Sequence, residues 1–150
     1  MLVEPIITEL RLPTRLGFEK VAMSTAATVA ELMGFSTDRV EDLKTAVSEA
    51  CINAIEHGNQ LNELLGVVVT MSMSVESLEV MIRDHGRGVR KEEMHVPDID
   101  RKMLGEEDPR GMGMFLIQAL VDEVEYVNEQ AGGGGSYARL TIYLNPGEKK

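Results

Sequence analysis

Apolar and polar residues alternate in several short stretches of the chain, and this alternation predicts β-strands. The alternating stretches are residues 6–13, 66–75, 77–84, 123–129 and 136–144. The first ends at Pro13, which suits the end of an edge strand because proline cannot donate a ladder hydrogen bond. The second and third follow each other almost directly, so we expect them to form a hairpin.

Two longer stretches instead repeat their apolar residues at helical spacing. Residues 16–34 read as one helix and end on a glycine, which is favoured just after a helix. The next helix should run from about 38 to 57, because Ser36 and its neighbours are good N-cap residues and Gly58 ends the pattern. A third, shorter helix is expected at about residues 113–121.

The order of these elements predicts the fold class. It runs strand, two helices, two strands, a long loop, a short helix and two strands. Strands that follow one another in pairs favour a mostly antiparallel sheet with helices on one face, an α+β two-layer sandwich. The 150 residues suit a single domain over residues 1–150. The polar loop at 85–111 is longer than compact domains usually contain, and such loops are typically functional lids or disordered segments.

Composition and charge narrow the possible partners and the compartment. The formal net charge is −10, which disfavours nucleic acid and anionic membrane as partners because both bind basic surfaces. No apolar run approaches the ~18 residues of a membrane span, and the N-terminus lacks a signal-peptide pattern. The single cysteine, Cys51, cannot form an intrachain disulfide and reads as a small buried hydrophobe, with a catalytic thiolate as the less favoured alternative. We therefore expect a cytoplasmic protein.

Three polar residues interrupt the second predicted helix at intervals of four. They are Glu49, Asn53 and His57. On a wheel of about 100° per residue, Glu49 and Asn53 share one flank of the apolar stripe, and His57 lies between that flank and the stripe. This placement suits the floor of a pocket. The alternative is a solvated helix flank, with His57 stabilised by the helix dipole.

The first of two glycine clusters follows the third predicted strand. In RDHGRGV, residues 83–89, Asp84 stands at the strand end and is followed by Gly86 and Gly88. A carboxylate accepts hydrogen bonds and so selects a donor such as an exocyclic amine. Glycines let the backbone pass close to a ligand. The alternative is a plain turn.

The second glycine cluster, DPRGMGMFLI, leads into the short third helix. Gly111 and Gly113 would open that helix, whose free N–H groups and positive dipole end form a natural anion site. The neighbouring Arg110 would add a cation. The alternative is a simple loop-to-helix joint.

Taken together and in this order, the motifs resemble those of the GHKL ATPase/kinase superfamily, which has the Bergerat fold. EACINAIEHGN resembles its Asn box, DHGRGV its first glycine box, and RGMGMFLIQALVDEVEY its second. GGGGSYARLTIYL resembles the closing strand. The resemblance covers nearly all of the chain and is greatest to the small anti-sigma-factor serine kinases of bacteria. It implies the histidine-kinase-like two-layer sandwich, with an ATP lid at about 89–110.

The resemblance also implies roles for individual residues, with ATP or ADP and Mg²⁺ as the ligands. The amide oxygen of Asn53 would bind the magnesium ion, and Glu49 would activate the attacking hydroxyl or water. Asp84 would bind the adenine amino group, and Gly86 and Gly88 would shape that wall of the site.

Further residues are implied less directly by the same resemblance. Backbone N–H groups at Gly111 and Gly113 would meet the phosphates, with His57 and Arg110 as neighbours of the nucleotide. Ser136 stands where the family often has a threonine after its glycines, so its hydroxyl is a candidate adenine contact.

The implied function is an anti-sigma factor that is also a serine/threonine protein kinase. It would phosphorylate a STAS-type anti-anti-sigma protein and bind a sigma factor. Such kinases are typically homodimers, and the first strand and first helix are candidates for the dimer face. The short lid argues against a chaperone-type or gyrase-type ATPase. With no upstream segment for a phosphoacceptor histidine, a complete sensor histidine kinase is not expected.

Two other functions remain open from the sequence. The first is a regulatory module that binds ATP or ADP and sequesters a partner without phosphotransfer. The second is the ATP-binding part of a two-component assembly that acts on a separate phosphoacceptor chain. The presence of Glu49 favours the kinase, since a nucleotide-binding clip needs no general base.

Overall fold

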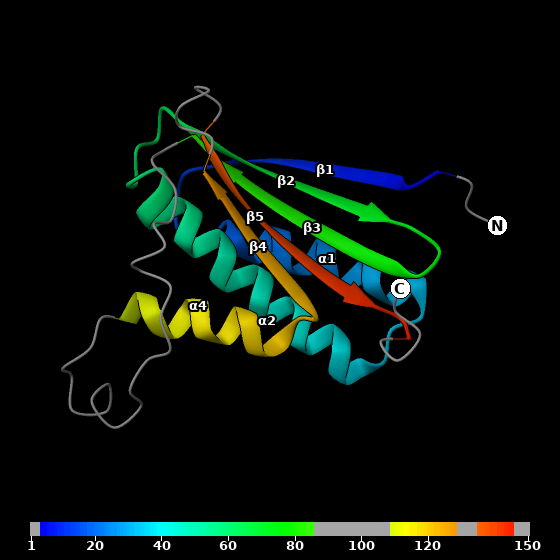
Figure 1. Cartoon of the computed structure of the whole chain (residues 1–150). Coiled ribbons are helices and arrows are strands. Elements are labelled where there is room, and N and C mark those ends of the chain that lie inside the picture. The colour runs from blue at the N-terminus through cyan, green and yellow to red at the C-terminus, as the bar shows by residue number, and fades with distance from the viewer. Residues whose placement is uncertain (1–3, 86–108, 129–134, 146–150) are drawn as a thin grey trace.

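The computed structural model describes residues 4–85, 109–128 and 135–145 (Figure 1). The elements in chain order are β1 (Ile6–Pro13), α1 (Glu19–Met33), α2 (Thr37–Asn53), a π-helical turn (Ala54–Gly58), β2 (Gly66–Met73), β3 (Ser77–Asp84), α4 (Pro109–Leu120), β4 (Glu123–Asn128) and β5 (Ser136–Tyr143).

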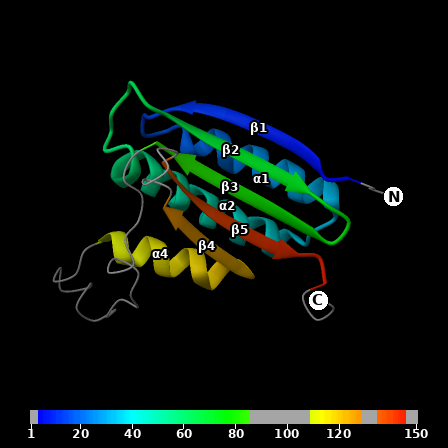
Figure 2. The same cartoon turned by 45° about the horizontal axis from the view of Figure 1, so that its top comes forward.

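The strands form one antiparallel sheet in the order β1-β2-β3-β5-β4. Figures 1 and 2 show α1, α2 and α4 on the same face of this sheet, with α2 between the other two. The predicted α+β two-layer sandwich is therefore confirmed. Neither α1, α2 nor α4 is long and apolar enough to cross a membrane.

The core lies between the sheet and α2, as the alternating pattern of the strands requires. On β2 and β3 every second side chain turns toward the helices and is buried, and the register continues this face onto β5. The largest fully buried side chains include Leu43, Val47, Ile55, Val67, Val69, Met71, Leu78, Val80, Ile82, Ile117, Leu140 and Ile142. Cys51 joins this core with no exposed surface, and burial raises the pKa of its thiol to about 12. The interpretation of Cys51 as a small buried hydrophobe is confirmed.

Local signals in the sequence set the end of α1 and the start of α2. Gly34 follows α1 with φ of 94°, the left-handed conformation that glycine adopts at little cost. The side chain of Ser36 accepts a hydrogen bond from the Arg39 N–H at 3.3 Å and caps α2. Both predicted boundary residues therefore act as predicted.

One ion pair ties the start of α2 to the far edge of the sheet. The Arg39 guanidinium donates to Asp122 Oδ2 at 2.6 Å, and this oxygen also accepts from the Tyr143 N–H at 2.7 Å. Asp122 stands between α4 and β4, so the contact fixes α2 relative to the elements that carry the second glycine cluster.

Two predicted boundaries are wrong in ways that matter for the site. The third helix begins at Pro109, not near residue 113, because proline is favoured at the first helical position, where no N–H is needed. The second helix is α-helical only to Asn53 and then widens into the π turn. A wheel of constant winding therefore does not place His57 correctly.

Candidate active site

The site begins where α2 changes its winding. Asn53 is the last α-helical residue, and the Asn59 N–H then bonds to the Ala54 carbonyl at 2.8 Å, five residues back. Such single π turns are rare and often mark functional positions in helices. Gln60 and Leu61 follow with φ of 53° and 59°, left-handed conformations that turn the chain sharply away from the helix.

Asn59 holds this turn in place, although none of the sequence motifs singles it out. Its side chain is buried and donates from Nδ2 to Thr14 Oγ1 at 2.9 Å and to the Gly66 carbonyl at 3.0 Å. Its Oδ1 accepts from the His85 N–H at 2.8 Å. One amide side chain thus joins the π turn to the end of β1, the start of β2 and the end of β3. Only these long-range partners distinguish Asn59 from an ordinary loop asparagine.

Asp84 lies at the end of β3 and turns its side chain toward the π turn. It is 6% exposed, and a Cβ on Gly58 would lie within 2.9 Å of its Oδ1. Gly135, with φ of 80°, passes so close to the Asp84 backbone that no side chain could stand there. Two glycines far apart in sequence therefore make room for Asp84, with Gly58 beside its carboxylate and Gly135 beside its backbone.

Ser136 lies opposite Asp84 in the pairing of β5 with β3 and is 3% exposed. Its hydroxyl donates to Asn128 Oδ1 at 3.3 Å. The sheet register therefore brings the predicted adenine contacts Asp84 and Ser136 into one layer.

Gly113 brings α4 against the polar flank of α2. A Cβ at this position would lie 2.7 Å from Glu49 Oε2 and 3.9 Å from Asn53 Oδ1. Because α4 begins at Pro109, Gly113 lies beyond the first helical turn, whose N–H groups alone lack partners within the helix. Gly113 matters here because it has no side chain, which lets α4 approach Glu49 and Asn53. Gly111 does lie within that first turn.

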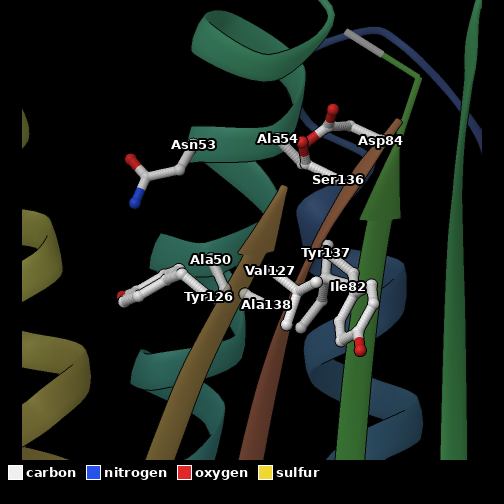
Figure 3. Close-up of a pocket in the computed structure, with 10 residues that line it drawn as sticks. All are labelled: Ala50, Asn53, Ala54, Ile82, Asp84, Tyr126, Val127, Ser136, Tyr137 and Ala138. Carbon is white, nitrogen blue, oxygen red and sulfur yellow. The ribbon is translucent and has the colours of Figure 1, made fainter. Parts of the chain in front are cut away.

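Asn53, Asp84 and Ser136 line a common pocket between α2 and the strands β3, β5 and β4 (Figure 3). The lining residues are Ala50, Asn53, Ala54, Ile82, Asp84, Tyr126, Val127, Ser136, Tyr137 and Ala138. Glu49 lies one turn before Asn53, and the half-buried His57 lies in the π turn. Gly86, Gly88, the lid residues 89–108 and the Arg110 side chain lie outside the described residues.

The electrostatic environment of Glu49 differs from that of a surface carboxylate. Burial, and then the nearby negative charge of Glu56, raise the pKa of Glu49 above its ordinary value. A raised pKa makes the carboxylate a better proton acceptor, as a general base requires.

Two polar groups in the pocket are buried without a hydrogen-bond partner, namely Asn53 Nδ2 and the Tyr126 hydroxyl. Buried polar groups normally find partners, so each exception calls for an explanation, such as a catalytic role or a bound ion or water. Within the described ranges, no three His, Cys, Asp or Glu side chains are grouped as a metal cluster.

Comparison with known proteins agrees with this geometry. Residues 13–142 match the family described as "Histidine kinase-like ATPase domain". This match spans most of the chain, and the chain therefore belongs to the histidine kinase-like ATPase family. The resemblance to the GHKL superfamily is confirmed.

Relatives within this family carry a more specific name. The chain is 35% identical over 130 residues to "Serine-protein kinase RsbW" of Oceanobacillus iheyensis, which covers 83% of this chain and 80% of the relative. It is 31% identical over 140 residues to the protein of the same name from Bacillus subtilis, covering 91% and 85%. Within the ATPase family, the chain belongs to the group of these RsbW proteins.

A solved structure supports the fold. The chain matches a crystal structure of the RsbU and RsbW domains of Rv1364c from Mycobacterium tuberculosis, with a TM-score of 0.65 and 20% sequence identity. The match covers 93% of this chain and 32% of that longer one. At this identity, the match supports the fold only.

Proposed function

We propose that this chain is an ATP-dependent serine/threonine protein kinase that phosphorylates a STAS-type anti-anti-sigma protein and binds a sigma factor. The observation that carries the proposal is the contact of Gly113 with Glu49 and Asn53 beside the pocket that Asp84 closes. Relatives with high coverage are named serine-protein kinases, and this agrees with the proposal.

The two ends of the site suit the two ends of ATP. Asp84 and Ser136 form a polar layer next to the apolar Ile82 and Ala138, which suits an adenine ring with its amino group on the carboxylate. The N–H groups of the first turn of α4, including that of Gly111, supply donors for the phosphates. Gly86, Gly88, Arg110 and His57 remain predicted neighbours of the nucleotide.

Asn53 suits a magnesium ion that is shared with the nucleotide. Its amide reaches the space next to Gly113, and its Nδ2 has no hydrogen-bond partner that would hold the amide in another orientation. The amide oxygen is the hard ligand that Mg²⁺ prefers, and most other ligands would be phosphate oxygens and water. When bound, the ion would neutralise charge on the phosphates.

In this proposal Glu49 acts as the general base. It lies one helical turn from Asn53 and beside α4, so a substrate hydroxyl near the terminal phosphate could reach its carboxylate. The carboxylate takes the proton of the serine or threonine hydroxyl as its oxygen forms a bond to the terminal phosphorus of ATP, and the bond from that phosphorus to the bridging oxygen breaks to release ADP. Its raised pKa favours this proton transfer.

The partner surfaces follow from the same proposal. A homodimer would use β1 and α1, where several large apolar side chains are exposed: Ile6, Ile7, Val21 and Leu32. The protein would act in the cytoplasm, where its sigma factor works.

A transfer assay tests the proposal. The protein is mixed with γ-labelled ATP and Mg²⁺ in an extract of the organism that makes it, beside a Glu49→Ala control. An acid-stable label on a small protein, absent in the control, supports the serine/threonine kinase and identifies the substrate. An acid-labile label contradicts it in favour of a phosphohistidine. No label, with nucleotide binding intact, contradicts it in favour of a nucleotide-gated binding module.

A further inference from the structure

Tyr126 lies in the same pocket, and no part of the proposed function uses it. It stands on β4 opposite Ala138, which in turn pairs with Ile82, so its side chain faces the helices. The next layer on this face holds Asp84 and Asn128. Figure 3 shows the ring reaching from β4 toward the side of the pocket on which α4 lies, as does the amide of Asn53.

The hydroxyl of Tyr126 is buried and has no hydrogen-bond partner, although the ring is only half-buried. A buried tyrosine normally directs its hydroxyl to a partner, because desolvating it without one is unfavourable. Burial raises the pKa of Tyr126 to about 12, so the hydroxyl keeps its proton at neutral pH and is available as a donor.

The position of this unsatisfied donor is not arbitrary. Three buried side-chain polar atoms lack a hydrogen bond in the part of the chain that the structure describes. Two of them, on Tyr126 and Asn53, belong to residues that line the pocket. The third, Arg139 Nε, lies 3.3 Å from the Glu79 carboxylate and so has an ionic partner. Among the described residues, two buried donors have neither a hydrogen-bond partner nor an ionic partner, and both lie in the pocket.

We propose that Tyr126 is a nucleotide-contact residue whose hydroxyl donates a hydrogen bond to an acceptor atom of the bound nucleotide. The inference rests on the proposed function, because it assumes that the pocket holds a nucleotide. Small side chains at Ala50 and Ala138 leave room for a ligand atom near the phenol. The contact explains why a polar tyrosine, and not a phenylalanine, stands in this apolar layer.

The first test compares Tyr126→Phe with the wild-type protein. Phenylalanine keeps the ring and removes only the hydroxyl, so the affinity for ADP should fall about 5- to 10-fold, the range of one lost hydrogen bond. The melting temperature without nucleotide should stay the same or rise, because the variant no longer buries an unsatisfied donor. Titration calorimetry and thermal unfolding measure the two effects.

Tyr143→Phe is the matched control. The Tyr143 hydroxyl donates to the exposed Glu123 carboxylate at 3.0 Å, outside the pocket, so its removal should leave ADP affinity unchanged. Two results would overturn the inference: Tyr126→Phe binds ADP as tightly as the wild type, or it melts at a lower temperature without nucleotide. The second would mean that the hydroxyl already has a partner in the free protein.

A series of shorter ligands identifies the acceptor. If Tyr126→Phe weakens adenosine, AMP and ADP by the same factor, the acceptor is on the nucleoside. If only the phosphorylated ligands lose affinity, the acceptor is a phosphate oxygen. Both patterns support the contact. A wild-type protein that binds none of these ligands overturns the proposed function itself, whereas equal binding by wild type and variant overturns only this inference.

Discussion

At the scale of single residues, the site depends on glycines, which have no side chain, as well as on polar side chains. Gly58 and Gly135 let the backbone close around Asp84, and Gly113 lets α4 approach Glu49. Each glycine stands where a methyl group would overlap the carboxylate of Asp84 or Glu49, or the backbone of Asp84. Replacing one of these glycines with alanine therefore tests whether the close contact is needed.

Gly58→Ala should disrupt the proposed adenine end of the site. The new Cβ would collide with the Asp84 carboxylate, so the variant should lose about 1–3 kcal/mol of stability and bind ADP at least about tenfold more weakly. Gly66→Ala is the control, because its Cβ would meet only the Leu12 carbonyl at an ordinary 3.5 Å. Calorimetric titration with ADP measures the effect. Wild-type affinity in Gly58→Ala would show that Asp84 has no part in binding.

Glu49→Gln should separate catalysis from binding. Loss of the proposed general base should lower the transfer rate about 10²- to 10⁴-fold while ADP affinity stays near that of the wild type. Rate measurements at saturating ATP, alongside ADP titration, test this expectation. A variant with full activity would exclude Glu49 as the base.

The same variant should be more stable than the wild type at neutral pH. A carboxyl whose folded pKa is raised favours the folded state at low pH and loses this contribution as pH rises through the folded pKa. At pH 7 the charged Glu49 therefore destabilises the fold, and a neutral glutamine removes this cost. At neutral pH, Glu49→Gln should melt at a higher temperature than the wild type. This difference should disappear at a pH below the pKa that Glu49 has in the unfolded chain. An equal difference in melting temperature at neutral and acid pH would show that packing, and not the charge of Glu49, causes it.

Glu56 should tune the pH dependence of the reaction. Its negative charge is the second cause of the raised Glu49 pKa, after burial. Glu56→Gln should therefore lower that pKa and move the acid side of the rate profile to lower pH, since the base must be deprotonated. A pH–rate profile of both proteins measures the shift. If the acid side of the pH–rate profile does not shift in Glu56→Gln, a group other than Glu49 controls it.

At the scale of elements, the π turn and its anchor Asn59 decide where α2 meets the sheet. The turn ends α2 against β3, and the three side-chain bonds of Asn59 connect it to β1, β2 and the residue after β3. The site thus depends on how several elements are joined at one buried amide.

Asn59→Ala should destabilise the protein by about 2–3 kcal/mol, because the His85 N–H and the Gly66 carbonyl lose their bonds to this side chain. The buried Thr14 hydroxyl would keep only its bond to the Leu65 carbonyl. Asn62→Ala is the control, since its Oδ1 accepts only from the exposed Leu64 N–H at 3.0 Å. Chemical denaturation measures both. Equal stability of the two variants would show that the buried network contributes little.

At the scale of the whole molecule, charge becomes important. The formal net charge of −10 makes the surface strongly acidic, while in the proposed function nucleotide binding would depend on backbone N–H groups and a metal ion near the pocket. The remaining negative charge can then act on other partners over a longer range.

Association with a basic sigma factor should therefore be steered electrostatically. Raising the salt concentration should slow association markedly and change dissociation much less. Stopped-flow or surface-binding kinetics at several salt concentrations would measure both rates. Association that does not respond to salt would exclude steering by the acidic surface.

Much of the fold could be predicted from the sequence because the signals are local. Alternation identifies β2 and β3, and Ser36 and Gly34 set helix ends through their own backbone and nearest neighbours. The start of α4 could not be placed from its glycines, because Pro109 lies in a polar stretch without a helical period.

The sequence by itself determined the elements, the family motifs and the residue types of the site, since periodicity and short motifs depend on neighbours along the chain. Only the tertiary structure decided how the site is assembled. The closeness of Gly113 to Glu49, the raised pKa of that carboxylate, and the unsatisfied hydroxyl of Tyr126 all arise where distant segments meet. Burial and partner distances are properties of those contacts, and no local pattern contains them.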